Sequence, residues 1–235
     1  MTYVCSDLHG LAVEPFKNML SSTEFEDGDR LYILGDVIDR NGDGGIELLE
    51  YIMSREDFTM LLGNHEDMLL RCRWLFNEVS DEGIAGLSTR SLEDLTVWMR
   101  NGCEPTIASL KKIIKTDKPR FDGLIDFVSS LPYYKTVEVN GRTFFLCHSG
   151  PGNFKKKRTP ESYTKNELIW YRPKVKDKFY ENITTVFGHT PTFVFSPKYQ
   201  GRILTTPTWI DIDVGAAAGL PPAFLRLDDM KEFYF

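Results

Sequence analysis

The sequence predicts an α/β protein whose first part forms a parallel sheet with crossover helices. Three observations lead to this prediction. Short apolar runs alternate with helix-like apolar periodicity over the first 65 residues. Each of the first three apolar runs is followed at once by a polar cluster. Farther along, two β-rich runs flank an Asn-Gly pair, which is typical of a hairpin.

The first part of the chain has the pattern strand, helix, strand, helix, strand. We expect strands at 3–5, 31–34 and 58–62, and helices at about 11–20 and 46–53. Parallel strands joined by helices have their carboxyl ends at one edge of the sheet. This edge is where open α/β sheets bind ligands, so the polar clusters there are candidates for a site.

A helical pattern follows from Met68 to about Ser130. Apolar side chains recur there at helical spacing, with Leu92, Leu95 and Met99 on one face. We expect residues 68–134 to form a helical insertion, or cap, within a single domain that spans 1–235.

The rest of the chain predicts further strands. Asn140 and Gly141 favour a two-residue type I′ turn between the two β-rich runs. The polar segment from 150 to about 178 is expected to be a loop with a short helix. Additional strands are expected at 185–187, 202–204, 209–212 and 223–227. The basic run at 155–158 is interpreted as a solvated loop, with the alternative that it attracts an anionic substrate.

Composition excludes several classes of protein. The 235 residues carry a net charge of −6, which argues against binding of nucleic-acid polymers or membrane surfaces as the main activity. Asp7 occurs before the N-terminal segment contains an apolar stretch as long as that of a signal peptide, so we expect a cytoplasmic protein. The four cysteines lie far apart and are expected to be reduced, buried thiols. A chain of this length needs no structural metal to fold, so any bound metal is expected to be functional.

Chemistry-bearing residues gather after the predicted strands. Asp7 and His9 are two residues apart in an extended segment, so their side chains leave the same face and could bind one ion. Asp36 follows Asp7 by 29 residues, and Asn64 follows Asp36 by 28, a spacing typical of repeated βα units. Asp39 and Arg40 lie close after Asp36, and His65 follows Asn64. Two later turns carry His148 and His189. We expect five strand ends to converge on one pocket.

These residue types indicate metal chemistry. Carboxylate, imidazole and amide oxygen suit Mn, Fe, Zn or Co, whereas the absence of cysteine at these points excludes a thiolate site. One carboxylate can bridge two ions, and two ions about 3.5 to 4 Å apart can hold the attacking and leaving oxygens of a phosphoryl displacement. The pattern therefore predicts metal-dependent hydrolysis of a phosphate ester without a protein nucleophile.

The motifs SDLHG, GDVIDR, GNHE, CHSG and GHTP, in this order, resemble the calcineurin-like metallophosphoesterases. Their details resemble the phosphoprotein phosphatase (PPP) branch, which includes small bacterial and phage serine/threonine protein phosphatases and symmetrical diadenosine tetraphosphatases. The resemblance implies a four-layer α/β/β/α metallophosphoesterase sandwich of two mixed sheets. Asp211, Asp213 and Gly215 resemble a late I-D-x-D-x-G element of this branch, and the strand after it is expected to complete the second sheet.

The resemblance also implies roles for individual residues. Two divalent metal ions are implied, with Mn the most suitable in vitro and Fe or Zn as alternatives. The implied ligands are Asp7, His9 and Asp36 for one ion, and Asp36, Asn64, His148 and His189 for the other, with Asp36 as the bridge. His65 is implied as the general acid, oriented by Asp39. Arg40, Asn64 and Arg172 are implied to bind the substrate phosphate.

The implied function is that of a serine/threonine protein phosphatase, in which a metal-bridging hydroxide attacks phosphorus. The expected partner is a phosphorylated protein or a small phosphoester. An alternative is a symmetrical bis(5′-nucleosyl)-tetraphosphatase, which acts on a dinucleoside polyphosphate; Trp74, Phe76 and Trp98 could then contact adenine, or form the core of the cap. A non-catalytic scaffold is a third alternative, disfavoured by the intact set of ligands.

Several residues also have structural interpretations. Asp39 could cap the following helix, Arg40 could pair with a surface carboxylate, and Arg172 could be an ordinary loop residue. Asp211 and Asp213 alternate with Ile210 and Ile212 as in a half-buried strand, which favours a supporting role over a catalytic one.

Overall fold

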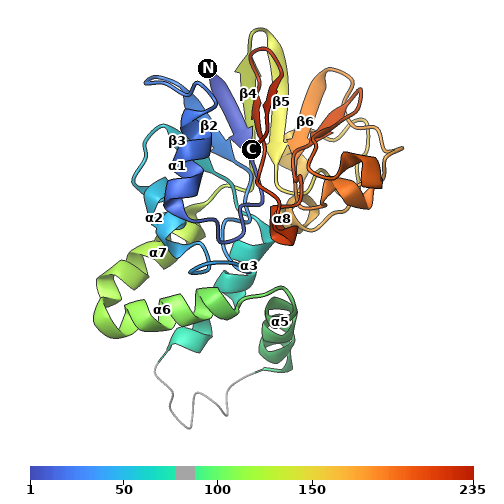
Figure 1. The fold of residues 1–235 in the computed structure, drawn as a ribbon. Coiled ribbons are helices and arrows are strands. Elements are labelled where there is room, and N and C mark those ends of the chain that lie inside the picture. Colours follow the sequence, from blue (N-terminus) through green and yellow to red (C-terminus); the bar gives the residue numbers. More distant parts are fainter. Residues whose placement is uncertain (78–87) are drawn as a thin grey trace.

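The computed structural model describes residues 1–77 and 88–235 and arranges them as two five-stranded sheets with helices (Figure 1). An apolar core joins the two sheets, with Val4 and Leu225 from one sheet and Phe144, Val186 and Ile210 from the other. The expected α/β architecture with two mixed sheets is confirmed, and the packing between sheets places two sets of strand ends beside each other.

The first sheet has the order β10-β9-β1-β2-β3. Its parallel part consists of β1 (Thr2–Cys5), β2 (Arg30–Ile33) and β3 (Phe58–Met60), as the alternation in the sequence predicts. The crossover helices α1 (Val13–Ser21) and α2 (Ile46–Met53) cover the outer face of this sheet. Both helices are amphipathic, and their buried residues join the core on that face.

The strand that follows the Asp211-x-Asp213 element is β9 (Phe224–Arg226), and it pairs antiparallel with β1. The expectation that this strand completes the second sheet is therefore wrong. Phe224 packs in the core under the helices while Leu225 packs between the sheets, so β9 is apolar on both faces and lies inside the first sheet. The edge strand β10 (Lys231–Phe233) is too polar to be predicted.

The second sheet has the order β4-β5-β6-β8-β7. Its strands are β4 (Tyr134–Val139), β5 (Arg142–Cys147), β6 (Ile183–Phe187), β7 (Leu204–Thr205) and β8 (Trp209–Asp211). The expected β4-β5 hairpin is confirmed: Asn140 and Gly141 have φ of 51° and 74°, the left-handed backbone that a type I′ turn requires.

The outer face of the second sheet is covered by the segment between β5 and β6. This segment is mostly irregular and contains η2 (Pro160–Ser162) and the short helix α8 (Lys165–Ile169). Tyr163, Leu168 and Phe179 pack there against Phe145 and Trp209. Arg158 of the basic run forms a bidentate pair with Glu167, at 2.9 and 3.0 Å, so this member of the run has a structural contact.

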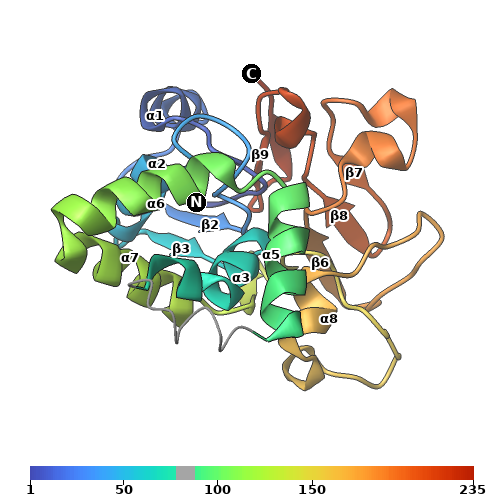
Figure 2. The same cartoon turned by 90° about the horizontal axis from the view of Figure 1, so that it is seen from below.

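The helices of the predicted insertion lie across the strand ends (Figure 2). Those in the described part of this segment are α3 (Asn64–Arg71), η1 (Arg73–Phe76), α5 (Thr89–Arg100), α6 (Glu104–Thr116) and α7 (Lys118–Ser130). Helix α3 starts at Asn64, four residues before the expected insertion, so Asn64 and His65 form its first turn. Trp98 and Phe76 are buried in the core and cannot stack on a nucleobase.

Short helical turns surround the end of the second sheet: η3 (Thr192–Val194), η4 (Pro197–Tyr199) and η5 (Ala216–Ala218). The longest helices of the described residues, α6 and α7, have 13 residues each. Within this part of the chain we find no helix with the length and apolar character needed to cross a bilayer.

Candidate active site

Five strand ends bring the predicted ligands together. Asp7 follows β1, Asp36 follows β2, Asn64 follows β3, His148 follows β5 and His189 follows β6. All five side chains are buried, as is His9. The carboxyl ends of the parallel strands in both sheets meet here, which explains how residues spread over more than 180 positions share one site.

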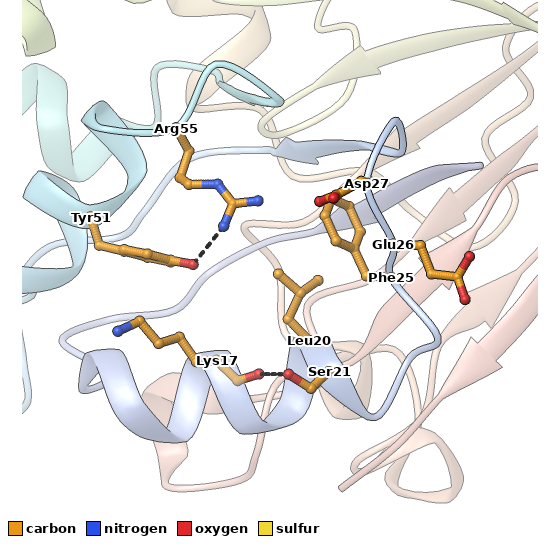
Figure 3. Close-up of a pocket in the computed structure, with 8 residues that line it drawn as sticks. All are labelled: Lys17, Leu20, Ser21, Phe25, Glu26, Asp27, Tyr51 and Arg55. Atoms are coloured by element: carbon orange, nitrogen blue, oxygen red, sulfur yellow. Dashed lines mark hydrogen bonds between the residues drawn. The ribbon is translucent and has the colours of Figure 1, made fainter.

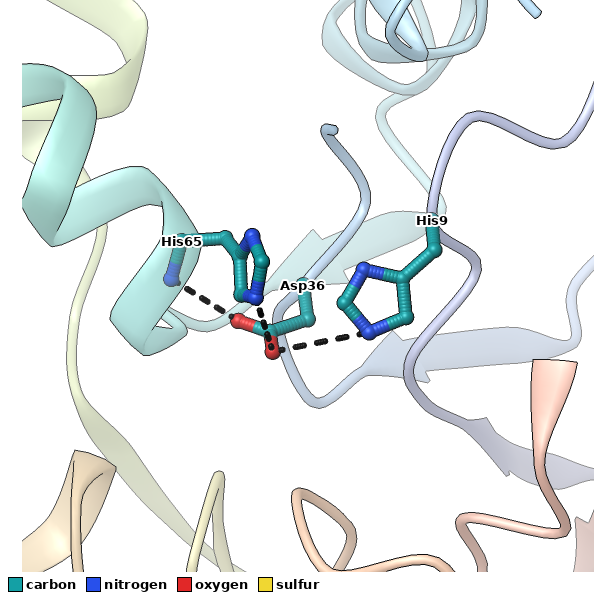
Figure 4. A group of neighbouring side chains, drawn as sticks. All are labelled: His9, Asp36 and His65. Carbon is teal, nitrogen blue, oxygen red and sulfur yellow. Dashed lines mark hydrogen bonds and ion pairs between the residues drawn. The ribbon is translucent and has the colours of Figure 1, made fainter. Parts of the chain in front are cut away.

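Asp36 lies at the centre of the site. Its Oδ2 atom is 3.3 Å from Nε2 of His148 and 3.8 Å from Nε2 of both His9 and His65, and Figure 4 shows the two rings at 3.8 Å on opposite sides of the carboxylate. The backbone N–H of His65 donates to Oδ1 of Asp36 at 3.0 Å. Among the residues that the structure describes, two groups have ligand atoms within 4.8 Å of one another: His9, Asp36 and His65, and Asp36, His148 and His189.

Asp7 belongs to the same site. Its Oδ1 atom lies 3.8 Å from Nε2 of His9, and its Oδ2 atom accepts hydrogen bonds from the backbone N–H of His189 and the hydroxyl of Ser6. Asn64 completes the cluster, because its Oδ1 atom lies 2.9 Å from Nε2 of His148. The structure therefore brings together all six residues that the sequence predicts as ligands.

The imidazoles have the arrangement that metal ligands require. Nδ1 of His148 faces the backbone oxygen of Leu34 at 2.8 Å, and Nδ1 of His9 faces that of Ile38 at 3.3 Å. These contacts direct both Nε2 atoms toward Asp36, as backbone acceptors commonly do for ligating histidines. Nε2 of His189 is buried and has no hydrogen-bond partner within the described residues. A divalent ion would supply the partner that this atom lacks.

Electrostatics favour the ligating protonation states of three residues. Burial and the nearby His65 lower the pKa of His9 to about 3, and burial and His148 lower the pKa of His189 well below its usual value. Both rings are therefore neutral, the form that binds metals. Burial opposes ionisation of Asp36, but His148 and His65 outweigh it and hold the pKa of Asp36 well below its usual range.

His65 and Asp39 form a buried pair. Nδ1 of His65 lies 2.6 Å from Oδ2 of Asp39, and Nε2 lies 3.3 Å from a guanidinium nitrogen of Arg40. Burial disfavours the imidazolium, but the carboxylates of Asp36 and Asp39 outweigh burial and raise the pKa of His65. Asp39 does not cap helix α2, whose first residue is preceded by Gly45. The carboxylate of Asp39 instead pairs with His65.

The site opens into a cavity of about 180 Å³. Arg40 and Arg172 both line it, together with His9, Asn64 and His189. Arg172 donates from Nη1 to the backbone oxygen of His189 and to the hydroxyl of Thr190, both at 3.2 Å. Within residues 1–77 and 88–235, Arg40 forms no ion pair with a carboxylate, and its guanidinium lies at the cavity wall beside His65. Both arginines therefore place positive charge at the cavity wall.

Sequence reasoning missed other residues of the cavity wall. Asn101 reaches it from the turn between α5 and α6, and Trp170 lies with its ring edge-on to His189 at 6.3 Å between centroids. Asp213 also lines the cavity, while its Oδ1 accepts a hydrogen bond from the backbone N–H of Gly215. Asp211 accepts in the same way from the backbone N–H of Asp213, so the two carboxylates hold the loop after β8. No sequence pattern identified Asn101.

Sequence reasoning also left the role of Glu66 undefined, although this residue belongs to the GNHE motif. Its buried carboxylate accepts hydrogen bonds from four backbone N–H groups. Three of them belong to Asp36, Val37 and Ile38, and the fourth belongs to Gly63. Glu66 therefore fixes the loop that carries Asp36.

The backbone is strained at the candidate active site. Six non-glycine residues of the site have positive φ, from 40° to 75°: Asp7, His9, Asp36, Asp39, Arg40 and His189. Such conformations are uncommon for residues with a Cβ atom and persist only where the surrounding structure enforces them. Gly35 relieves the same crowding, since a Cβ there would lie 2.5 Å from the backbone nitrogen of Gly63.

A second pocket, of about 320 Å³, lies near the opposite end of the first sheet, between α1 and α2 (Figure 3). Its cations already have carboxylate partners, because Lys17 pairs with Glu14 and Arg55 pairs with Asp57. Metal-ligating histidines are absent from its wall, which consists of described residues: Lys17, Leu20, Ser21, Phe25, Glu26, Asp27, Tyr51 and Arg55. This pocket has none of the chemistry of the cavity at the strand ends.

Two mixed sheets with nitrogen and oxygen donors at their strand ends are typical of metallophosphoesterases, a class that hydrolyses phosphoesters with divalent metal ions. The model of the calcineurin-like phosphoesterase family matches residues 2–209. The chain therefore belongs to the calcineurin-like phosphoesterase family.

Symmetrical bis(5′-nucleosyl)-tetraphosphatases are among the curated relatives of this chain. The chain is 31% identical to that of Buchnera aphidicola over 152 residues, which cover 62% of this chain and 55% of the relative. It is 30% identical to that of Pseudomonas putida over 129 residues, which cover 53% of this chain and 41% of the relative. The matched segments thus span about half the length of these relatives.

Solved structures share the fold. A crystal structure assigned as a candidate diadenosine tetraphosphatase has a TM-score of 0.60 at 15% identity, with coverage of 100% of this chain and 92% of the other. The cold-active protein-tyrosine phosphatase of a psychrophilic Shewanella species has a TM-score of 0.53 at 14% identity, with coverage of 99% and 79%. At these identities the likeness concerns the fold alone.

Proposed function

We propose that the chain hydrolyses dinucleoside polyphosphates with two divalent metal ions, as a symmetrical tetraphosphatase does. Water would cleave the central phosphoanhydride of diadenosine tetraphosphate to give two molecules of ADP. The convergence of six candidate ligands, the His65–Asp39 pair and two arginines on one cavity carries the proposal of phosphoryl hydrolysis. The relatives with named activity support the choice of substrate.

In this proposal, Asp7, His9 and Asp36 would hold one ion, and Asp36, Asn64, His148 and His189 would hold the other. When bound, the ions would lower the pKa of a shared water and neutralise charge on the phosphoryl group. The nitrogen and oxygen donors suit Mn, Fe or Zn, with Mn as the first choice for reconstitution.

The side chains of the protein supply the remaining steps. Arg40 and Arg172 bind and orient the phosphoryl group through charge-assisted hydrogen bonds. His65 carries a proton on Nε2 and gives it to the leaving oxygen, while Asp39 holds the Nδ1 proton and the orientation of the ring. The raised pKa of His65 favours the protonated form that this role needs.

A serine/threonine protein phosphatase is the second candidate. The size of the cavity is compatible with both candidates, since about 180 Å³ admits a phosphoryl group but leaves the rest of the substrate outside. A phosphorylated side chain on an extended peptide meets this condition as well as a nucleotide does. Trp170 and Asn101 at the cavity would contact either substrate.

The test is phosphate and ADP release by metal-free protein reconstituted with Mn. Diadenosine tetraphosphate, a phosphothreonine peptide and p-nitrophenyl phosphate are compared at equal concentration, with an Asp36→Asn variant as the inactive control. Preference for the dinucleotide with ADP as sole product supports the first candidate. Preference for the peptide overturns it in favour of the second. No turnover with Mn, Fe or Zn contradicts both.

A further inference from the structure

The carboxylate of Asp39 is completely buried and accepts three side-chain hydrogen bonds. Its Oδ2 atom lies 2.6 Å from Nδ1 of His65 and accepts from Nε1 of Trp98 at 2.7 Å. Its Oδ1 atom accepts from the hydroxyl of Thr106 at 2.5 Å. Trp98 belongs to α5 and Thr106 to α6, so two of the three partners come from the helical insertion.

The insertion also holds the backbone beside this carboxylate. The N–H of Asp39 donates to the hydroxyl oxygen of Thr106 at 3.1 Å, so the two residues bond reciprocally. The N–H of Arg40 donates to the backbone oxygen of Gly102, in the turn between α5 and α6, at 2.8 Å. Asp39 and Arg40 both have positive φ, and these contacts enforce that conformation.

We propose that Trp98 and Thr106 are positioning residues of the active site, and that the helical insertion fixes the orientation of His65 through Asp39. The inference rests on the proposed role of His65 as proton donor. Fixed donors on both oxygens hold the carboxylate of Asp39 in one orientation, so it presents Oδ2 to Nδ1 of His65 in one geometry. Nε2 of the ring is then directed toward the cavity.

Both positioning residues are fully buried, and neither lines the cavity. They therefore act on the reaction only through Asp39 and His65, which predicts a particular kinetic signature. Loss of either donor should impair proton donation to the leaving oxygen and leave phosphate binding intact. Proton donation matters for poor leaving groups such as alkoxides, and little for p-nitrophenolate.

The experiment compares Mn-loaded variants on p-nitrophenyl phosphate and on glycerol 2-phosphate, an alkyl ester. Thr106→Val removes the hydroxyl at nearly constant shape, Thr106→Ser keeps it, and Trp98→Phe removes the indole N–H. Thr23→Val is the matched control, because Thr23 is also fully buried and its hydroxyl donates only to the backbone oxygen of Leu20. Bound Mn and thermal unfolding are measured for each variant.

We expect Thr106→Val and Trp98→Phe to lower kcat on the alkyl ester by roughly tenfold to a hundredfold, with little change on p-nitrophenyl phosphate and in KM. Thr106→Ser should restore the rate, and Thr23→Val should leave it unchanged. Equal losses on both substrates, or no recovery with Thr106→Ser, would overturn the positioning role. If Thr106→Val does not fold, Trp98→Phe provides the same comparison.

The His65→Asn variant separates this inference from the proposed function. If His65→Asn loses activity equally on both substrates, the proton-donor role of His65 is wrong. If His65→Asn shows the selective loss on the alkyl ester but Thr106→Val and Trp98→Phe retain full rates, only the positioning inference is wrong.

Discussion

The backbone of Gly188 lies directly against the carboxylate of Asp7. A Cβ atom at Gly188 would stand 2.1 Å from Oδ2 of Asp7, far inside van der Waals contact. The next residue, His189, donates its backbone N–H to that same oxygen at 2.9 Å. Gly188 thus allows a residue of the second sheet to approach a residue of the first closely enough to share one site.

We therefore predict that Gly188→Ala displaces Asp7 and lowers both Mn affinity and turnover by at least about tenfold. Calorimetric titration with Mn and a phosphatase assay measure the two effects. The matched control is Gly123→Ala in helix α7, where a Cβ would meet nothing within 4 Å. That variant should keep full activity and gain about 0.5 to 1 kcal/mol of stability. Equal metal affinity in both variants would contradict the prediction.

Replacing Glu66 with Gln should destabilise the protein. The Glu66 carboxylate accepts four backbone N–H groups, and an amide NH₂ would face some of these donors without an acceptor. We expect a loss of about 2 to 3 kcal/mol in the free energy of unfolding, measured with urea. Glu14→Gln, at an exposed position, serves as control and should change stability by less than about 1 kcal/mol. If the two substitutions change the free energy of unfolding by similar amounts, Glu66 does not fix the loop that carries Asp36.

Asp36→Asn should abolish hydrolysis and weaken metal binding. The carboxylate lies between three imidazoles, and an amide at this position removes the charge that would bridge two ions. We expect Mn affinity to fall by more than the roughly tenfold to hundredfold loss that follows removal of an outer-shell partner. Metal content after dialysis and phosphate release are the measurements. A variant with two bound ions and normal turnover would refute the assignment of Asp36.

The Arg158–Glu167 pair predicts a pH-dependent contribution to stability. The Arg158 guanidinium, together with other hydrogen bonds, holds the pKa of Glu167 below its usual value of 4.5. A lowered pKa in the fold means that the stabilisation is present above about pH 4.5 and decreases as the pH falls. Arg158→Met should therefore be less stable than the unmodified protein near pH 7, and this difference should shrink progressively in acid. Urea unfolding across this range measures the difference, and a constant difference would exclude the ionic contribution.

The cysteines should be unreactive in the native protein. All four thiols are buried and unpaired, and burial raises the pKa of Cys72 to about 11 and those of Cys103 and Cys147 to about 12. Because the thiolate is the reactive form, a thiol reagent near pH 8 should label none of them until the protein unfolds. Four thiols should react in guanidinium. Rapid labelling of the native protein would contradict the buried positions.

Local patterns determined which parts of the fold could be predicted. The alternation of strands and helices before residue 65 and the Asn140–Gly141 turn are encoded within short segments, and both are confirmed. The position of β9 is not encoded in this way. Apolar residues on both faces of Phe224–Arg226 indicate burial, but they do not specify which of two sheets supplies the neighbours.

The same distinction applies to the site. Asp36 and His148 could be identified because each follows an apolar strand within a few residues. The hydrogen bonds of Asp39 to Trp98 and Thr106 join residues 59 and 67 positions apart, and no periodicity in the sequence relates them. Trp170 could not be placed at the cavity for the same reason, since its position depends on how the irregular segment packs on the second sheet.

The division of the ligands between the sheets has a consequence for the order of folding. Asp7, Asp36 and Asn64 follow strands of the first sheet, whereas His148 and His189 follow strands of the second. A folding intermediate with only one sheet formed would contain only part of the predicted set of metal ligands. We therefore expect tight metal uptake to begin only when the two halves dock, so that the kinetics of Mn binding during refolding would report the last step of assembly.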